Sequence, residues 1–248
     1  MEGYDASTYG ERFADVYDEW YGDVTDVAAT VAALTSLADG GPVLELGVGT
    51  GRLAIPLVDR GLEVHGIDAS PAMLERLRAK PGGGAVRTTV GDFADAGPAH
   101  PDGFALAFVA FNTLFNLTTA DAQQRCFTNV ARRLRPGGAF VVEAFVPDPD
   151  AAPAGAGLTT RSIGVDHVEL QATLADLGAQ TISGSTVTIT ASGITLRPWH
   201  IRWATPDELD RMAAIAGLER AARWSGWDGA DHVPDDTRHV TVYRRAQA

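Results

Sequence analysis

The chain has 248 residues, 45% of them hydrophobic, which suits one large globular domain or one domain with an insertion. It carries 20 basic and 32 acidic residues, and this net charge of −12 repels phosphate backbones, so no nucleic-acid partner is expected. Cys126 is the single cysteine, so the chain has no internal disulfide framework. No apolar run is long enough to span a membrane, and the acidic N-terminal segment does not resemble a signal peptide. We therefore expect a cytoplasmic protein with no membrane partner.

The N-terminal segment carries aromatic side chains at the spacing of one helix face. Tyr9, Phe13 and Tyr17 recur every four residues, and this period predicts a helix over residues 4–21. Tyr9 and Tyr17 are about two turns apart and could face one cavity, with Tyr21 as a weaker candidate. The helix either packs on the core or forms part of a lid over a binding site.

A buried strand, residues 42–46, runs into a turn with glycines at three alternate positions, and an amphipathic helix follows. Gly47, Gly49 and Gly51 remove side chains where a ligand must touch the backbone, and the helix directs its free N–H groups at the turn. The third glycine comes one residue earlier than in a dinucleotide fingerprint, and an acid, Glu45, precedes the first. Asp68 ends the second predicted strand, where its carboxylate could accept both ribose hydroxyls.

Glu45 to Gly51 and Asp68 together resemble the cofactor site of class I S-adenosylmethionine (AdoMet) methyltransferases. Three later segments fit the same family: Gly91-Asp92-Phe93 after the third strand, residues 104–114 at the fourth strand and its exit, and residues 134–140 at the turn into the fifth. The resemblance implies an α/β fold with a Rossmann-like sheet of seven strands and helices on both faces. It also implies AdoMet as the cofactor.

The resemblance assigns individual residues to that cofactor. Asp92 would accept a hydrogen bond from the adenine amino group, and Ala69 and Met73 would line the adenine. Asp92 could also be an ordinary turn residue, and Met73 could equally belong to the core. The complete set expected at the cofactor is Tyr17, Glu45, Gly47, Gly49, Gly51, Arg52, Asp68, Ala69, Met73, Gly91, Asp92, Phe93 and Phe111.

We expect a single methyltransferase domain, 1–248, with four parts. An N-terminal helical lid covers residues 1–40, including a second helix with Asp23 as a possible N-cap. A cofactor-binding core spans 41–146, and a loop follows. Short alternations of Thr, Val, Ile and Leu predict a small antiparallel sheet of three or four strands over 158–204, inserted after the fifth strand. A capped helix and a closing hairpin form 205–248.

Relatives that methylate small molecules often use such an insert as an acceptor-binding cap. Along its last strand, alternation puts Trp199 and His200 on opposite faces, and either face could line the acceptor or merely pack. The residues expected at the acceptor are Tyr9, Tyr21, Asn112, Phe115, Asn116, His167, Trp199 and His200. Tyr9, Tyr17 and Phe115 are the catalytic candidates, and no His or Cys spacing indicates a metal.

The tyrosine-bearing lid resembles that of small-molecule N-methyltransferases of aminosugar and lincosamide-type antibiotic biosynthesis. Transfer to an amine needs mainly alignment, because burial lowers the pKa of the amine and removes the need for a strong base. Transfer to a hydroxyl needs a positioned base, which only His167 or His200 could supply. Some aminosugar N-methyltransferases carry a histidine near the position of Asn116, and its absence here argues against a direct base there.

The sequence therefore predicts an AdoMet-dependent N-methyltransferase acting on a small molecule. If the protein is an enzyme of another kind, the alternative is a small-molecule O-methyltransferase. If it is not an enzyme, the alternative is a catalytically inactive assembly or regulatory protein that binds the cofactor. The exposed aromatic helix or the inserted sheet could also serve as contacts in a homo-oligomer.

Overall fold

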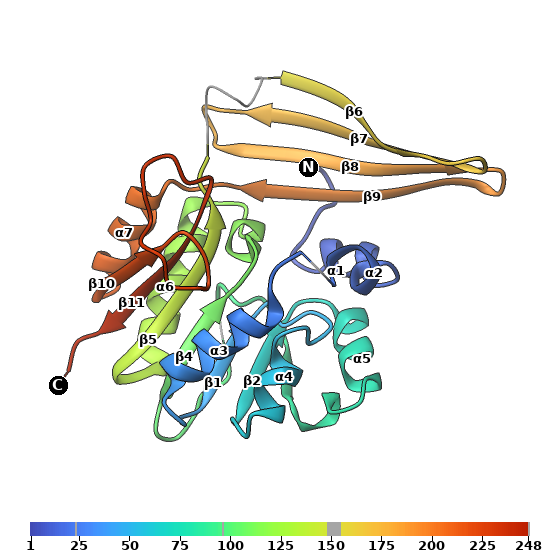
Figure 1. Ribbon diagram of the computed structural model, residues 1–248. Coiled ribbons are helices and arrows are strands. Elements are labelled where there is room, and N and C mark those ends of the chain that lie inside the picture. The colour runs from blue at the N-terminus through green and yellow to red at the C-terminus, as the bar shows by residue number, and fades with distance from the viewer. Residues whose placement is uncertain (23, 96, 148–154, 248) are drawn as a thin grey trace.

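The computed structural model describes residues 1–22, 24–95, 97–147 and 155–247, and the predicted cap at Asp23 lies outside them. Figure 1 shows a core sheet flanked by helices, with a second, elongated sheet lying across one end of the core. The two short N-terminal helices lie between the core and this second sheet. Among the described residues, no helix is long and apolar enough to cross a membrane.

The core sheet has seven strands in the order β10-β11-β5-β4-β1-β2-β3, which confirms the predicted Rossmann-like sheet. Strands β1 and β4 are parallel, but the order in which the chain adds strands to the sheet reverses between them. Open α/β sheets bind ligands at such a switch point, at the carboxyl ends of their strands. Only β11 runs antiparallel to its neighbours β5 and β10. The strands are β1 (Val43–Leu46), β2 (Val64–Asp68), β3 (Arg87–Val90), β4 (Phe104–Val109), β5 (Leu134–Phe145), β10 (Leu218–Trp224) and β11 (Arg238–Arg245).

Helices cover both faces of this sheet and form two apolar layers. On one face, Leu34 and Leu57 pack with Phe108, and on the other, Phe127 and Leu209 pack within a second cluster. Neighbouring strand residues alternate between these layers, as a sheet buried on both faces requires. The helices are α3 (Val27–Ala38), α4 (Ala54–Asp59), α5 (Pro71–Ala79), α6 (Ala120–Arg133) and α7 (Pro206–Ile215), with short 3-10 turns η1 (Gly83–Ala85) and η2 (Thr113–Asn116).

The lid is shorter and less regular than the sequence predicts. The expected helix over 4–21 is divided into α1 (Thr8–Phe13) and α2 (Tyr17–Tyr21), because the N–H of Val16 bonds to the carbonyl of Phe13, three residues back, instead of four. The next helix, α3, packs in the core rather than over the site, so the lid ends near residue 22 instead of 40.

The inserted sheet is antiparallel and has four strands, in the order β6-β7-β8-β9. Its first strand begins at residue 155, three residues before the predicted start of the insert. The sheet contacts the lid along β9, where Arg197 Nη2 lies 2.7 Å from Asp15 Oδ2. The strands are β6 (Gly155–Ile163), β7 (His167–Asp176), β8 (Thr181–Thr190) and β9 (Gly193–Arg202).

The start of α7 joins the insert to the core. Thr205 Oγ1 accepts a hydrogen bond from the N–H of Glu208 at 3.2 Å, and Glu208 Oε2 accepts one from the N–H of Thr205 at 2.8 Å. The same Oε2 accepts a bond from Gln180 Nε2, in the turn between β7 and β8, at 2.8 Å. One carboxylate therefore caps the helix and attaches the insert to it.

We expect Glu208→Ala to lower the free energy of unfolding by about 1–2 kcal/mol, because a cap and a bond to the insert are lost together. Urea denaturation measures this change. Asp207→Ala removes an exposed acid from the same helix turn and should cost less than about 0.5 kcal/mol. Equal losses in the two variants would contradict this role of Glu208.

Candidate active site

A first cavity lies at the carboxyl ends of β1, β2 and β3, beneath the lid. Asp68 Oδ2 accepts a hydrogen bond from the N–H of Gly49, and its Oδ1 accepts one from the N–H of Ser70, both at 2.8 Å. These bonds fix the carboxylate at the tip of β2. The predicted cofactor residues that line this cavity are Tyr17, Gly47, Gly49, Asp68, Ala69, Met73, Asp92 and Phe93.

The glycine turn is needed for two different close approaches. A Cβ on Gly47 would lie 2.4 Å from Thr113 Cγ2, so a larger residue would displace the turn that follows β4. A Cβ on Gly51 would lie 2.9 Å from Leu77 of α5. Gly51 thus serves helix packing beside the first cavity, and neither Gly51 nor Gly91 lines a described cavity.

A second, smaller cavity lies on the other side of the glycine turn and is lined by Glu45, Arg52 and Phe111. The Glu45 side chain is 5% exposed, and its Oε2 has no hydrogen-bond partner among the described residues. Burial raises the pKa of this carboxyl to about 8, and the nearby Arg52 guanidinium only partly offsets the effect. A buried acceptor of this kind favours a ligand that brings a cationic donor.

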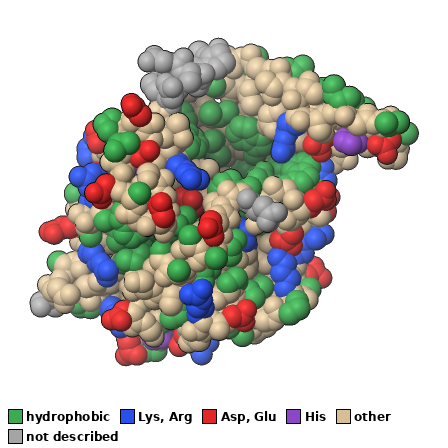
Figure 2. Space-filling model, viewed as in Figure 1, with side chains coloured by type: hydrophobic (Ala, Val, Ile, Leu, Met, Phe, Trp, Pro, Cys, Tyr) green, Lys and Arg blue, Asp and Glu red, His purple; other side chains and the backbone are tan. Residues whose placement is uncertain are grey.

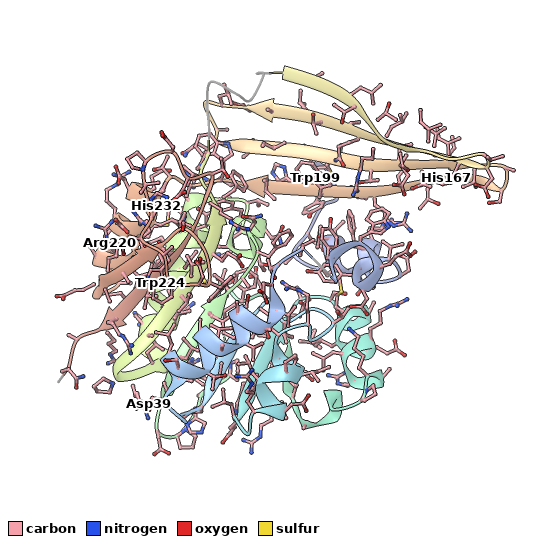
Figure 3. The ribbon with its side chains drawn as sticks, in the orientation of Figure 1. Asp39, His167, Trp199, Arg220, Trp224 and His232 are labelled. Carbon is pink, nitrogen blue, oxygen red and sulfur yellow. The ribbon has the colours of Figure 1, made fainter. Side chains whose placement is uncertain are left out.

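A third cavity, of about 320 Å³, opens between the lid, the exit of β4 and the inserted sheet. Figure 2 shows the hollow beneath the inserted sheet, where hydrophobic side chains gather. In Figure 3, Trp199 lies on the part of β9 that passes over the lid. The predicted residues that line this cavity are Tyr9, Tyr17, Tyr21, Phe111, Asn112, Asn116 and Trp199.

Tyr17 and Thr113 line all three cavities, so they mark the point where the cavities meet. Burial raises the pKa of Tyr17 to about 12 and that of Tyr9 well above its usual value. Both phenols are therefore neutral near pH 7 and can donate or accept hydrogen bonds. Both side chains are therefore placed to contact ligands in more than one of the three cavities.

The lid is held to the glycine turn by Asp18 of α2. Its Oδ1 accepts a hydrogen bond from Thr50 Oγ1 at 2.5 Å and lies 2.8 Å from Lys80 Nζ. On the α1 side, Glu11 Oε1 accepts bonds from Ser70 Oγ at 2.7 Å and from the N–H of Ala72 at 3.1 Å. These contacts place Tyr9 and Tyr17 over the cavities.

The chain leaves β4 through two residues in the left-handed region, Phe111 with φ 47° and Asn112 with φ 63°. Such a conformation is costly for a side chain as bulky as Phe, and it persists only where neighbours enforce it. The N–H of Phe111 donates to Glu143 Oε2 at 2.8 Å, and Asn112 Oδ1 accepts from the N–H of Phe145 at 2.7 Å. Strand β5 thus holds one wall of the third cavity.

Three of the predicted acceptor residues do not reach a described cavity. Phe115 is fully buried against Phe145. Because a 3-10 helix has three residues per turn, η2 places Thr113 and Asn116 on the side of the cavity and Phe115 on the side of the core. His167 lies at the far end of the inserted sheet in Figure 3, 3.1 Å from Asp166. His200 faces away from the third cavity and contacts Ser183 and Tyr4.

Other residues line the third cavity without being predicted from the sequence, among them Thr113, Arg161, Gln171 and Thr186. Gln171 and Thr186 are paired across β7 and β8, so alternation in the insert could have indicated them. Arg161 lies at a register shift between Thr160 and Ser162, which no local pattern reveals.

Comparison with known proteins agrees with this geometry. Residues 43–138 match a family described as a methyltransferase domain. Over 244 residues the chain is 31% identical to the cypemycin N-terminal methyltransferase of a Streptomyces species, covering 97% of this chain and 99% of that protein.

Two solved structures extend the comparison. The CcbJ methyltransferase from Streptomyces caelestis is 40% identical, with a TM-score of 0.88 over 99% of this chain and 100% of that one. The sugar N-methyltransferase KedS8 from Streptoalloteichus sp shares the fold, with a TM-score of 0.69 over 100% of this chain and 99% of that one, at 19% identity. The chain therefore belongs to the class I S-adenosylmethionine-dependent methyltransferases.

Proposed function

We propose that the protein transfers the methyl group of AdoMet to an amine nitrogen of a small molecule in natural-product biosynthesis. The observation that carries this proposal is the composition of the third cavity. Aromatic side chains of the lid, β4 and β9 line it, while none of its described lining residues is His, Asp or Glu. A hydroxyl acceptor would need such a base, whereas a buried amine loses its proton more easily.

The described residues fit AdoMet. The unpartnered Oε2 of Glu45 offers an acceptor for the ammonium of the methionine part, and the glycine turn leaves room for its backbone contacts. Asp68 would hold the ribose and Asp92 would face the adenine, since both line the first cavity. When bound, AdoMet supplies a methyl group on a positively charged sulfur.

The chain's own contribution is alignment, exclusion of water and tolerance of cationic charge. Tyr17 and Thr113 lie where the three cavities meet, so they would contact both the donor and the acceptor. Neutral phenols of Tyr9 and Tyr17 can accept an N–H of the amine and orient its lone pair. The ring centroids of Tyr21 and Phe111 lie 6.0 Å apart in an edge-to-face arrangement, and such aromatic rings suit the positive charge that the methylated amine acquires.

The names of the relatives favour the same reaction class. The cypemycin methyltransferase acts at an N-terminus and KedS8 is named as a sugar N-methyltransferase, so both a sugar amine and a peptide amine are suitable test acceptors. A cavity of about 320 Å³ lies at the lower end of ordinary ligand pockets, which favours an acceptor of modest size or one end of a larger molecule.

The test is transfer of labelled methyl from AdoMet to matched acceptors that differ only at the reacting group. We expect aminosugars to be methylated and the corresponding hydroxyl sugars not, with a rate that rises with pH as the amine becomes neutral. A free peptide N-terminus forms the third arm. Preference for hydroxyls would overturn the choice of nitrogen, and no transfer to any acceptor would favour a protein that binds AdoMet without catalysis.

His200→Ala is the control for the hydroxyl alternative. His200 does not line the third cavity, so its removal should leave turnover nearly unchanged. A collapse of turnover with unchanged AdoMet affinity would instead assign the base to His200.

Glu45 makes AdoMet binding depend on pH. The pKa of its carboxyl is about 8 in the free protein, so the carboxyl is protonated below that pH. It must therefore release its proton when the ammonium of AdoMet binds as its partner. We expect the affinity of the wild type to rise from pH 6 to pH 8, and that of Glu45→Gln to be weaker with little pH dependence. Calorimetry in buffers of different ionisation enthalpy should show proton release for the wild type only.

The same raised pKa has a consequence for stability. The raised pKa of Glu45 stabilises the folded protein without ligand, and this stabilisation is complete below pH 4.5, the ordinary pKa of a Glu carboxyl. It is lost as the pH rises to about 8. The melting temperature of free Glu45→Gln should therefore fall less than that of the wild type over this interval. Parallel curves would contradict the buried, neutral state of Glu45.

Glu143 is expected to act as a positioning residue for the acceptor. Glu143→Met removes the acceptor of the Phe111 N–H, and the left-handed turn should then relax. We expect kcat/KM for the acceptor to fall about tenfold, since a hydrogen bond to a charged group is worth about 1.5–3 kcal/mol.

Glu143→Gln retains a side-chain oxygen at the same place and should recover most of this activity. Equal losses in Glu143→Gln and Glu143→Met, or a loss that only follows the melting temperature, would contradict a positioning role.

A further inference from the structure

The third cavity carries one formal charge. Among its described lining residues, Arg161 is the single charged side chain, and it comes from β6 of the insert. The register of β6 against β7 shifts between Thr160 and Ser162, so Arg161 is the extra residue at this shift. Irregularities of this kind often lie beside active sites, where the extra residue redirects a side chain. The irregular point of the strand thus coincides with the residue that reaches the cavity.

An aromatic ring of the lid orients the guanidinium of Arg161, which lies over Trp20 at 4.9 Å from the ring centroid. A second arginine, Arg197, lies over the same ring at 5.4 Å, but its Nη2 is already 2.7 Å from Asp15 Oδ2. Contact with an aromatic face uses none of the N–H donors of a guanidinium, because these lie in the plane of the group. Arg161 is exposed, so it presents its donors at the mouth of the cavity.

Gln171 supplies a second donor on the same wall. Thr186 Oγ1 donates to Gln171 Oε1 at 3.2 Å, so the oxygen of this amide is engaged. The amide Nε2 is buried and has no hydrogen-bond partner among the described residues. Gln171 is paired with Thr159, two residues before Arg161, so the positions of the two donors lie about 7 Å apart along the sheet. One group of ligand oxygens can therefore accept from both side chains.

The charge of Arg161 indicates what kind of oxygen these donors bind. Methyl transfer from AdoMet to an amine involves a positively charged sulfur before the reaction and a positively charged nitrogen after it. A guanidinium has the same sign as both, so it opposes their presence in the cavity unless an anion neutralises it. None of the described residues that line the cavity is Asp or Glu, so we look to the acceptor for this anion.

We propose that the acceptor carries a carboxylate as well as its amine, and that Arg161 and Gln171 bind this carboxylate. The proposal rests on the proposed transfer to an amine and narrows the acceptor to amino acids, short peptides and aminosugars that carry an acid. The carboxylate accepts from the planar fork of the guanidinium and from Gln171 Nε2. The amine of the same molecule is then directed to Tyr17 and Thr113, where the three cavities meet.

The size of the cavity indicates how far apart the two groups of the acceptor are. A cube of about 320 Å³ has an edge of about 7 Å. An extended dipeptide spans a similar distance, at about 3.5 Å per residue. A dipeptide can therefore place its terminal amine at one end of the cavity and its carboxylate at the other. Its C-terminal amide has nearly the same shape without the negative charge.

The test compares matched acceptors with and without the anion. Alanyl-alanine and its C-terminal amide form one pair, and glucosaminuronic acid and glucosamine form the other. Transfer of labelled methyl is measured at about pH 9, where the amines are largely neutral. In each pair that is methylated, we expect kcat/KM of the wild type to be about tenfold higher for the carboxylate, the scale of one charge-assisted hydrogen bond. Equal values would overturn the carboxylate site and leave the choice of nitrogen intact.

Arg161→Gln should abolish this preference, and Arg161→Lys should restore only part of it, because Lys keeps the charge without the planar fork. The matched control is Arg60→Gln, which removes the same charge from the exposed C-cap of α4 and should keep the preference. Loss of the contact with Trp20 would slow both members of a pair alike, so the ratio separates anion binding from support of the lid. A preference that survives in Arg161→Gln would overturn the proposal.

Calorimetry in the presence of S-adenosylhomocysteine gives a second readout that needs no turnover. Alanyl-alanine should bind the wild type about tenfold more tightly than its amide does, and Arg161→Gln should bind the two equally. If no amine is methylated, or hydroxyl sugars are methylated instead, the choice of nitrogen fails, and this difference in binding still decides the carboxylate site. Equal binding of the pair to the wild type, or no measurable binding of either carboxylate, would overturn the site.

Discussion

The position of Tyr17 depends on a lid that is held from two sides. On the core side, Asp18 bonds to Thr50 and Lys80 beside the glycine turn. On the insert side, the guanidinium of Arg161 lies 4.9 Å from the centre of the Trp20 ring. Helices as short as α1 and α2 are not stable alone, so these contacts decide whether the lid is ordered. The meeting point of the three cavities exists only while the lid is in place.

The two walls of the third cavity are held in different ways. The lid is attached by the ion pairs of Asp15 and Asp18, which contribute at most about 1 kcal/mol each, and by the packing of Phe13 and Ala14 against Met73 of α5. The opposite wall, at Phe111 and Asn112, is fixed by hydrogen bonds to the buried strand β5. One wall is therefore part of the core sheet, whereas the other depends on contacts between separate short elements.

Much of the cofactor side was predictable because its signals are local. The spacing of Gly47, Gly49 and Asp68 indicates a turn and a strand end, and in the structure the N–H of Gly49 donates to Asp68 Oδ2 at 2.8 Å. The acceptor side was less predictable. Phe115 is buried although the sequence predicts it in the cavity, and Thr113 lines the cavity without being predicted. The 3-10 turn η2 and the left-handed residues before it decide which side chains face the cavity. No periodic pattern in the sequence records either feature.

The sequence by itself determined the seven-stranded core, the glycine turn and the insert, because these follow from hydrophobic periodicity, glycine spacing and turn residues within short segments. Only the tertiary structure decided that the N-terminal helix is divided, that Glu45 is buried without a partner, and which face of the insert meets the active site. Each of these depends on contacts between segments far apart in the chain, as when Arg197 of β9 reaches Asp15 of the lid. Local patterns describe single elements, whereas burial and orientation are properties of their packing.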